Sequence, residues 1–257
     1  MDDFIKTFWN KQANTYKSSP NASWKDVFAI ELEQEQLTKL ISKSGKYILD
    51  VGCANGFAIF KQALIHKDKN FTGIDFAQDM INHAKNEWSK LDEGAKNRIA
   101  FECADIRKLP YPDSKFDFTL TTRTLINLPN WTDQQKAILE LARVTKKGGL
   151  IALSEAFYEP LVNLNAIRII AGLEPLVEHD FNRYLKYRKL VSFLNDQGFR
   201  HSTIEFTSTY YFGTRILREL VTQDNSYESN FNRYFFELAR EFEGGNFGIQ
   251  KLFLIER

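Results

Sequence analysis

Short apolar runs alternate along this chain with longer segments whose apolar residues recur at helical spacing. The runs cover residues 47–51, 71–74, 99–104, 116–122 and 150–154. Continuous runs of this length are typical of parallel strands that are buried on both faces. Helical spacing is found in the segments 29–41, 57–64, 78–88, 132–147 and 185–197. In the fourth segment, Thr132 and Gln135 would form a capping box that opens the helix, and Gly148 and Gly149 would end it. Strands and helices that alternate in this way predict an α/β fold with a doubly wound, mostly parallel sheet.

Polar residues at the ends of these runs predict a binding site at one edge of the sheet. Gly52 and Gly56 follow the first run and let the backbone approach a ligand closely. Asp75, Asp105 and Arg123 end or follow the next three runs. The carboxyl ends of parallel strands share one edge, where doubly wound sheets bind nucleotide-like ligands and use an acid to bind the ribose. We therefore expect such a ligand, with Asp75 at its ribose, although any single acid could instead be a helix cap or a turn residue.

These residues resemble the class I S-adenosylmethionine-dependent methyltransferases, over about residues 46–155. The likeness rests on the stretches 49–56, 73–81, 103–106, 116–117 and 141–149. Ala54 stands where the family usually has the middle glycine of the first stretch. The resemblance implies a seven-stranded Rossmann-like sheet whose last strand, at about 249–255, is antiparallel. It also implies S-adenosylmethionine as cofactor, S-adenosylhomocysteine as product, and a small-molecule type of enzyme.

The resemblance assigns a role to each residue of the first stretch. Asp50 would help to organise the methionyl end of the cofactor. The backbone at Gly52, Ala54 and Gly56 would give the cofactor room. Asp75, at the end of the second strand, would accept hydrogen bonds from both ribose hydroxyls.

The adenine and the methionyl amine are assigned in the same way. Phe76 and Met80 would lie near the adenine, Ile106 would pack on the ring, and Asp105 would accept a hydrogen bond from the exocyclic amine. Thr122, or the threonine before it, would present an oxygen to the methionyl amine.

A nicotinamide dinucleotide is the main alternative ligand. Its usual motif has three glycines, whereas only Gly52 and Gly56 are present here. Asp50 also precedes Gly52 by two positions, and a pyrophosphate would be repelled by a carboxylate in so small a site. A sulfonium cation would be attracted, so Asp50 favours the methyl donor.

Methyl transfer from a sulfonium is an in-line displacement, and its main demand is that the acceptor atom lies close to the methyl group. A hydroxyl acceptor also needs a base, and histidine is favoured because its usual pKa lies near neutrality. The candidate catalytic residues are His179, Glu155 and Tyr158. The candidate acceptor-binding residues are Tyr16, Arg123, Asn127 and Arg168. The arginines would suit an anionic acceptor, although exposed arginines are usually solvated.

The chain reads as a single domain of 257 residues, with a cofactor-binding core at 29–155. Residues 1–28 would form an N-terminal lid, 156–184 a cap on the acceptor side, and 214–245 a second helical insertion. Lids of this kind exclude water and align the reactants. These segments should therefore decide which acceptor is used.

Charge and composition narrow the partners. The formal net charge is +1, which predicts no attraction to nucleic acid or to an anionic membrane. No segment approaches the roughly 20 apolar residues of a membrane span. Two cysteines and four histidines without ligand spacing predict a reduced, cytoplasmic protein without a metal. We expect a monomer or a homodimer.

Several acceptors are compatible with the sequence. The first hypothesis is an oxygen of a sugar, phosphorylated or nucleotide-linked precursor of a surface glycan. The alternatives are N- or C-methylation of an amine or quinone-type metabolite. A protein that binds S-adenosylmethionine without transferring its methyl group, and a dehydrogenase with an atypical loop, remain as hypotheses from other classes.

Overall fold

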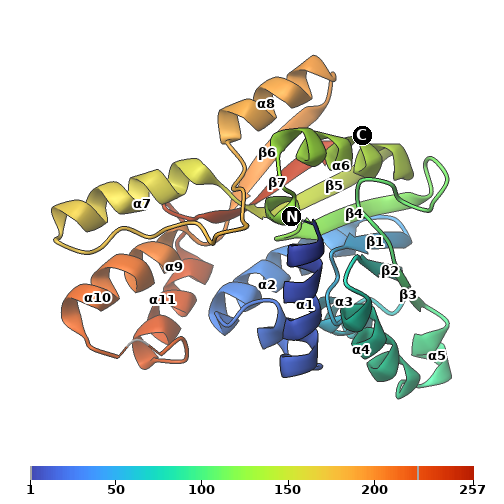
Figure 1. Cartoon of the computed structure of the whole chain (residues 1–257), viewed down its shortest axis with the longest axis horizontal. Helices are drawn as coiled ribbons and strands as arrows, with labels where there is room; N and C mark the ends of the chain where they lie inside the picture. The colour runs from blue at the N-terminus through green and yellow to red at the C-terminus, as the bar shows by residue number, and fades with distance from the viewer. Residues whose placement is uncertain (1, 225) are drawn as a thin grey trace.

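A seven-stranded sheet forms the centre of the computed structural model, which describes residues 2–224 and 226–257 (Figure 1). The strands are β1 (Tyr47–Val51), β2 (Asn70–Asp75), β3 (Ile99–Cys103), β4 (Phe116–Thr122), β5 (Thr145–Ala156), β6 (Arg200–Glu205) and β7 (Gln250–Glu256). Their order is β3-β2-β1-β4-β5-β7-β6. β7 runs antiparallel to both neighbours and the other pairs are parallel, so the predicted fold class is confirmed.

Helices cover both faces of the sheet, as Figure 1 shows. One face carries α2 (Val27–Lys43), α3 (Phe57–Ile65) and α4 (Gln78–Ser89), and the other carries α6 (Trp131–Val144) and α8 (Tyr187–Asp196). The alternation of side chains along a strand explains how both cores form. Ile48 of β1 packs in the core with α2 and α3, whereas Leu49 and Val51 pack in the core with α6 and α8. A strand buried on both faces is therefore apolar at almost every position.

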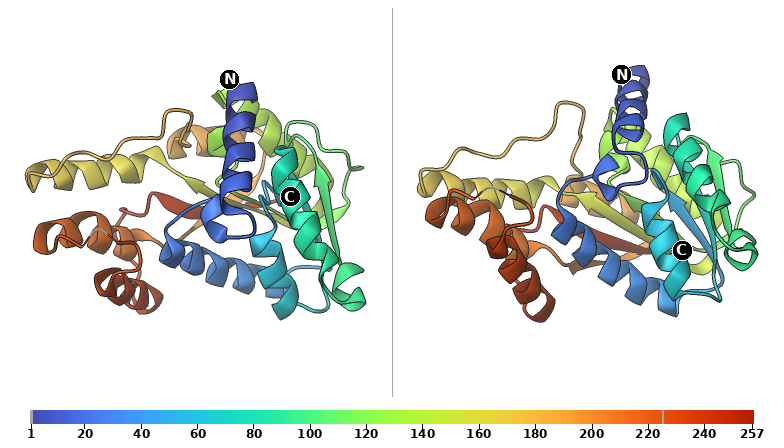
Figure 2. Two further views of the ribbon diagram at one scale, coloured as in Figure 1. Left: turned by 60° about the horizontal axis from the view of Figure 1, so that its bottom comes forward. Right: turned by 90° about the horizontal axis from the view of Figure 1, so that it is seen from below.

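The remaining helices lie outside these two layers. α1 (Asp2–Tyr16) stands beside α4, and a short 3-10 turn (Pro20–Ala22) links it to α2. A one-turn helix, α5 (Glu93–Lys96), precedes β3. Figures 1 and 2 show a separate group of helices at one end of the sheet. That group consists of α7 (Tyr158–Ile170), α9 (Ser208–Phe212), a π-helical turn (Gly213–Leu217), α10 (Arg218–Val221) and α11 (Asn230–Glu241). None of the helices described is long and apolar enough to cross a membrane.

Both ends of α6 differ from the sequence-based expectation. Asn130 caps the helix, because its side chain accepts a hydrogen bond from the Asp133 amide, so a capping box that starts at Thr132 is wrong. The helix ends at Val144 instead of at Gly148 and Gly149, because β5 begins at the next residue. β5 pairs there with β4 and then bulges before it resumes regular pairing, and the two glycines lie in this bulge.

The central position of β1 makes a prediction about stability. Leu49 is fully buried, so Leu49→Ala should lower the free energy of unfolding by about 2–5 kcal/mol. Leu64→Ala is the matched control, since Leu64 lies on α3 with 72% of its surface exposed and should cost less than about 0.5 kcal/mol. Urea unfolding measures both values. Equal losses would contradict the placement of β1 inside the core.

Candidate active site

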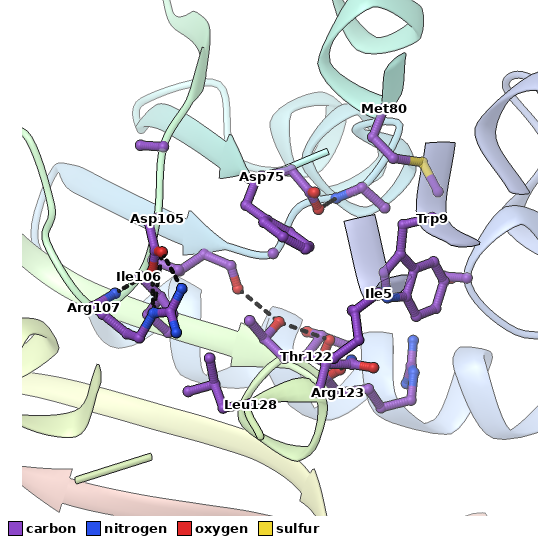
Figure 3. Close-up of a pocket in the computed structure, with 18 residues that line it drawn as sticks. Ile5, Trp9, Asp75, Met80, Asp105, Ile106, Arg107, Thr122, Arg123 and Leu128 are labelled. Carbon is purple, nitrogen blue, oxygen red and sulfur yellow. Dashed lines mark hydrogen bonds and ion pairs between the residues drawn. The ribbon is translucent and has the colours of Figure 1, made fainter. Parts of the chain in front are cut away.

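A pocket opens at the carboxyl edge of the sheet (Figure 3). The strand order reverses here, because β2 and β3 lie on one side of β1 and β4 and β5 lie on the other. Such a reversal of strand order creates a crevice in doubly wound sheets. The predicted cofactor residues that line it are Gly52, Ala54, Asp75, Phe76, Met80, Asp105, Ile106 and Thr122. Asp50 and Gly56 lie outside the lining. In Figure 3, Asp105 and Arg123 lie at opposite ends of the pocket, and Asp75 lies above the space between them.

The loop after β1 needs glycine at two positions. Gly52 has a φ of 82°, and an added Cβ would overlap the Thr124 side chain. Gly56 has a φ of 80° and caps α3, where an added Cβ would lie 2.8 Å from the Phe101 ring. Ala54 also takes the left-handed conformation, with a φ of 48°, which costs roughly 1–2 kcal/mol for a residue other than glycine. The family's usual glycine at this position therefore has a visible reason.

Asp75 links this loop to β2. One carboxylate oxygen accepts a hydrogen bond from the Ala54 amide at 3.0 Å, and the other accepts one from the Ala77 amide at 2.8 Å. Each oxygen keeps a second lone pair for a ligand. Burial raises the pKa of Asp75 to about 6, although the amide hydrogen bonds act in the opposite direction.

Asp50 lies beneath the loop and is almost fully buried. Its Oδ1 has no hydrogen-bond partner among the residues described. Burial, together with the nearby carboxylates of Glu33 and Asp75, raises its pKa to about 7, and Arg123 offsets part of this effect. A buried acceptor without a partner is costly unless a ligand supplies the donor. Asp50 therefore fits a cationic, hydrogen-bonding ligand.

Asp105, the predicted partner of the adenine amine, already has a protein partner. Its Oδ2 accepts a hydrogen bond from Arg107 Nη2 at 2.6 Å, and its Oδ1 accepts one from the Arg107 amide at 2.8 Å. Burial acts to raise the pKa of Asp105, but the hydrogen bonds and charge of Arg107 lower it overall. An adenine amine would have to share this carboxylate with Arg107, which also lines the pocket.

Glu155 organises the turn after β4 instead of facing the pocket. Its carboxylate accepts hydrogen bonds from the Thr121 hydroxyl at 2.8 Å and from the amides of Thr124 and Leu125, both at 3.0 Å, with a longer one from Ile126. It is fully buried, which raises its pKa to about 7 despite these hydrogen bonds. Both oxygens are occupied, so we correct its assignment as a candidate base to a structural role.

A buried polar cluster behind this turn was missed by the sequence analysis. Glu33 of α2 is fully buried and accepts two hydrogen bonds from Arg123 Nη1, at 2.9 and 3.1 Å. The Ser154 hydroxyl and the Gln250 side-chain amide also donate to Glu33. A charged residue in the apolar stripe of 29–41 was the available signal, because an unpaired glutamate is almost never buried.

His179, Tyr158 and Tyr16 are not in the lining of this pocket, whereas Arg123 and Asn127 are. His179 is exposed, and its ring lies 4.7 Å from that of Phe181, which also contacts α1. Tyr158 is 42% exposed beside Lys186, and Tyr16 is half-buried near Lys25. Asn127 does line the pocket, and its Oδ1 has no partner among the residues described.

Arg168 does not reach the pocket. It is buried on α7 and forms an ion pair with Glu219 at 2.9 Å, and its Nε donates to the Glu174 carbonyl at 2.7 Å. Its guanidinium is used within the helical group at the end of the sheet. We therefore correct its assignment as an acceptor-binding residue.

The N-terminal segment forms one wall of the pocket. Ile5 and Trp9 of α1 line it together with Ser23. Asn55 lies in the loop after β1, between Gly52 and Gly56, which we call the glycine loop. Its side-chain amide donates to the Lys17 carbonyl at 2.7 Å and to the Ser19 carbonyl at 2.8 Å, and so holds the N-terminal segment in place. Ala54 of the same loop also packs in a cluster with Trp9 and Ala13 of α1, so the wall and the loop are joined by hydrogen bonds and by packing.

Residues 42–182 match a family model described as a methyltransferase domain, and the chain belongs to that family. It is a class I S-adenosylmethionine-dependent methyltransferase of the small-molecule type. The predicted family, enzyme class and cofactor are thereby confirmed.

The methyltransferase is similar to several named proteins. Over 118 residues it is 33% identical to 27-O-demethylrifamycin SV methyltransferase of Amycolatopsis mediterranei. This match covers 46% of this chain but only 41% of that protein. It is 24% identical over 215 residues to ubiquinone biosynthesis O-methyltransferase of Coxiella burnetii, covering 82% and 83% of the two chains. The fold matches that of magnesium protoporphyrin IX methyltransferase from Synechocystis, with a TM-score of 0.65, 16% identity and complete coverage of both chains.

The raised pKa values of Asp50 and Asp75, about 7 and about 6, predict how cofactor binding depends on pH. A bound cation and ribose hydroxyls favour the ionised carboxylates, so binding should release protons. Affinity for S-adenosylmethionine should therefore rise severalfold from about pH 6 to about pH 7.5. Without cofactor the sign is opposite: these groups keep their protons longer when folded, so stability should fall as pH rises from about 4 to about 7.

Calorimetry in buffers of different ionisation enthalpy measures the released protons. The variant Asp50→Asn is the control and should flatten the dependence on pH. Proton uptake on binding, or affinity that falls over this range, would contradict the assignment.

Proposed function

We propose that this methyltransferase binds S-adenosylmethionine in the pocket at the carboxyl edge and transfers the methyl group to a hydroxyl oxygen of a small molecule. The observation that carries the proposal is that Gly52 and Ala54 of the loop after β1 and Asp75 at the end of β2 line one pocket. When bound, the cofactor supplies an electrophilic methyl group on a positively charged sulfur. The protein has to hold the acceptor in line with it and keep water out.

The polar atoms around the pocket suggest how the cofactor lies. Asp75, which keeps free lone pairs, would bind the ribose hydroxyls. The unpartnered oxygens of Asp50, Thr122 and Asn127 would accept hydrogen bonds at the methionyl end. Phe76, Met80 and Ile106 line the pocket and would enclose the adenine between Asp75 and Asp105. The chemistry of these side chains suits the parts of the cofactor that they would contact.

The acceptor would enter beside the turn after β4. The N-terminal lid supplies Ile5 and Trp9 to the pocket wall. The 156–184 segment reaches the same turn from the other side, because the Arg183 amide donates to the Ile126 carbonyl at 2.7 Å. The lid and the 156–184 cap would thus enclose the acceptor from two directions.

The ion pairs of two arginines indicate which charge the acceptor carries. Arg123 is paired with Glu33, and Arg168 is paired with Glu219. The Arg168 guanidinium is used inside the helical group, and Glu33 balances the charge of Arg123, so an acceptor that is neutral near the reacting oxygen is favoured over a phosphorylated one. The names of the relatives include O-methyltransferases, which favours oxygen over nitrogen or carbon. None of the relatives named above supports a surface-glycan precursor.

The second candidate is a protein that keeps the fold without transferring a methyl group. The fold is also similar to that of a protein named the [4+2]-cyclase SpnF, with a TM-score of 0.56, 23% identity and coverage of 87% and 80% of the two chains. Incubation with methyl-labelled cofactor and a panel of phenolic, polyketide-like and sugar hydroxyl compounds separates the two. Label on a product favours methyl transfer, whereas tight binding without label on any compound favours the second candidate.

Asp75 provides the direct test of the ribose site. Asp75→Asn removes the charge but keeps the shape, and should weaken cofactor binding by about 1.5–3 kcal/mol because charge-assisted hydrogen bonds are lost. Asp68→Asn is the control, since the Asp68 side chain is 75% exposed in a turn outside the pocket lining. Calorimetry with S-adenosylhomocysteine gives both affinities. An unchanged affinity in Asp75→Asn would mean that the ribose lies elsewhere.

His179 remains the candidate base, because it packs on Phe181, whose ring lies 6.4 Å from that of Trp9 in the pocket wall. His179→Ala should lower turnover by about 10²–10⁴-fold if it accepts the hydroxyl proton. Cofactor affinity should not change. His201→Ala, on β6 beside Phe253, is the matched control and should have normal turnover. Normal turnover in His179→Ala would remove this residue from the mechanism.

A further inference from the structure

Arg123 stands at the end of the pocket where the amino-acid part of the donor would lie. It lines the pocket beside Thr122 and Asn127, opposite Asp105 (Figure 3). Thr122 Oγ1 and Asn127 Oδ1, both in the pocket lining, are buried oxygens without partners among the residues described, and so is Oδ1 of Asp50, which lies outside the lining. These acceptors suit an ammonium group, and a guanidinium beside them suits a carboxylate. This end of the pocket therefore has the chemistry to recognise an α-amino acid.

Only one nitrogen of the Arg123 guanidinium, Nη1, donates hydrogen bonds among the residues described. Glu33 binds Nη1 through both carboxylate oxygens, and the Trp24 ring lies 4.9 Å from the guanidinium carbon. Nε and Nη2 have no hydrogen-bond partner in the ranges 2–224 and 226–257. A carboxylate needs two parallel N–H donors, and these two atoms present that geometry.

The backbone of Arg123 is also fixed. Its φ of 52° is unusual for a residue other than glycine. The conformation is held because the Arg123 amide donates to the Ser154 carbonyl at 2.8 Å, and its own carbonyl accepts from Asn127 Nδ2 at 2.6 Å. Strained backbone of this kind persists only where the surroundings enforce it, and it is concentrated at functional sites.

Glu33 is in turn held by residues far away in the sequence. Its fully buried carboxylate accepts from the Ser154 hydroxyl on β5 and from the Gln250 amide on β7. These donors come from the centre of the sheet, so Glu33 cannot follow Arg123 if the arginine swings outward. Glu33 is therefore a rigid anchor for one edge of the guanidinium.

We infer that Arg123 binds the carboxylate of the methionyl end of the donor, and that Glu33 is the positioning residue that orients it. The inference rests on the proposed function, because it assumes that S-adenosylmethionine occupies this pocket. It moves Arg123 from the acceptor site, where the sequence analysis placed it, to the donor site.

Two ligands that differ only in the amino-acid part test the inference. S-adenosylhomocysteine carries the carboxylate and ammonium groups, whereas 5′-methylthioadenosine has the same adenosine and sulfur without them. In Arg123→Gln, the Kd of S-adenosylhomocysteine should rise roughly ten- to hundredfold because a charged, bidentate contact is lost. The Kd of 5′-methylthioadenosine should stay within about twofold of the wild-type value, because that ligand makes no contact with Arg123.

A mutant cycle tests the role of Glu33. Glu33→Gln should weaken S-adenosylhomocysteine severalfold and leave 5′-methylthioadenosine unchanged. In the Arg123→Gln background the same substitution should have no further effect, because Glu33 acts only through Arg123. Asp26→Asn is the control, since it breaks a second buried ion pair, with Arg215, away from the pocket. Thermal unfolding of every variant verifies that each one is folded.

The possible failures can be told apart. If wild-type protein binds neither ligand, the proposed function fails. If wild-type protein binds both, and Arg123→Gln weakens both equally or neither, the proposed function stands and the assignment of Arg123 is wrong. If the acceptor KM rises in Arg123→Gln while both donor-like ligands bind normally, Arg123 belongs to the acceptor site. Additive effects of Glu33→Gln and Arg123→Gln would overturn the positioning role of Glu33.

Discussion

The buried carboxylate of Glu155 is the constraint on which the pocket depends. It lies on β5 and accepts hydrogen bonds from three successive amides, those of Thr124, Leu125 and Ile126. Those amides would otherwise lack partners in a tight turn that starts with a left-handed residue, Arg123. The turn then directs Thr122, Arg123, Thr124, Asn127 and Leu128 into the pocket. A charged residue in the sheet core thus shapes a site that it does not touch.

Buried acids recur around this pocket and differ in how they are satisfied. Glu33 has a guanidinium, a hydroxyl and an amide as partners, and Asp105 has Arg107. Asp50 has one oxygen without a partner, and Asp75 has only backbone amides. Burial is the main reason why the pKa values of Asp50 and Asp75 are raised, and it also raises the pKa of the hydrogen-bonded Glu155. Within the described part of the chain, Asp50 and Asp75 differ from Glu33 and Asp105 in that neither has a cationic side chain hydrogen-bonded to it.

Much of the fold could be predicted from the sequence, because parallel strands that are buried on both faces have continuous apolar runs. The acids at the ends of β1, β2 and β3 follow directly from those runs, so eight of the predicted cofactor residues line the pocket. Ends of helices were less readable. Asn130 and Thr132 are both good caps, and only the packing of α6 selects the first.

Partners distant in the sequence could not be predicted. Glu33 and Arg123 are 90 residues apart, and nothing local in either segment indicates that they pair. Glu155 looked like a base because it ends a strand, but its donors come from a neighbouring turn that has no periodic pattern. Arg168 was predicted to bind the acceptor, but it pairs with Glu219, which is 51 residues away, on α10. Local patterns identify which residues are polar and buried, whereas their partners are set by the tertiary fold.

One amide side chain ties two parts of the pocket wall together. Asn55 belongs to the loop after β1, yet it donates to two carbonyls of the segment that links α1 to α2. Any motion that lifts α1 to admit a ligand has either to break both hydrogen bonds or to drag the glycine loop along. If S-adenosylmethionine binds as proposed, opening of the entrance and release of the spent donor would therefore be mechanically coupled.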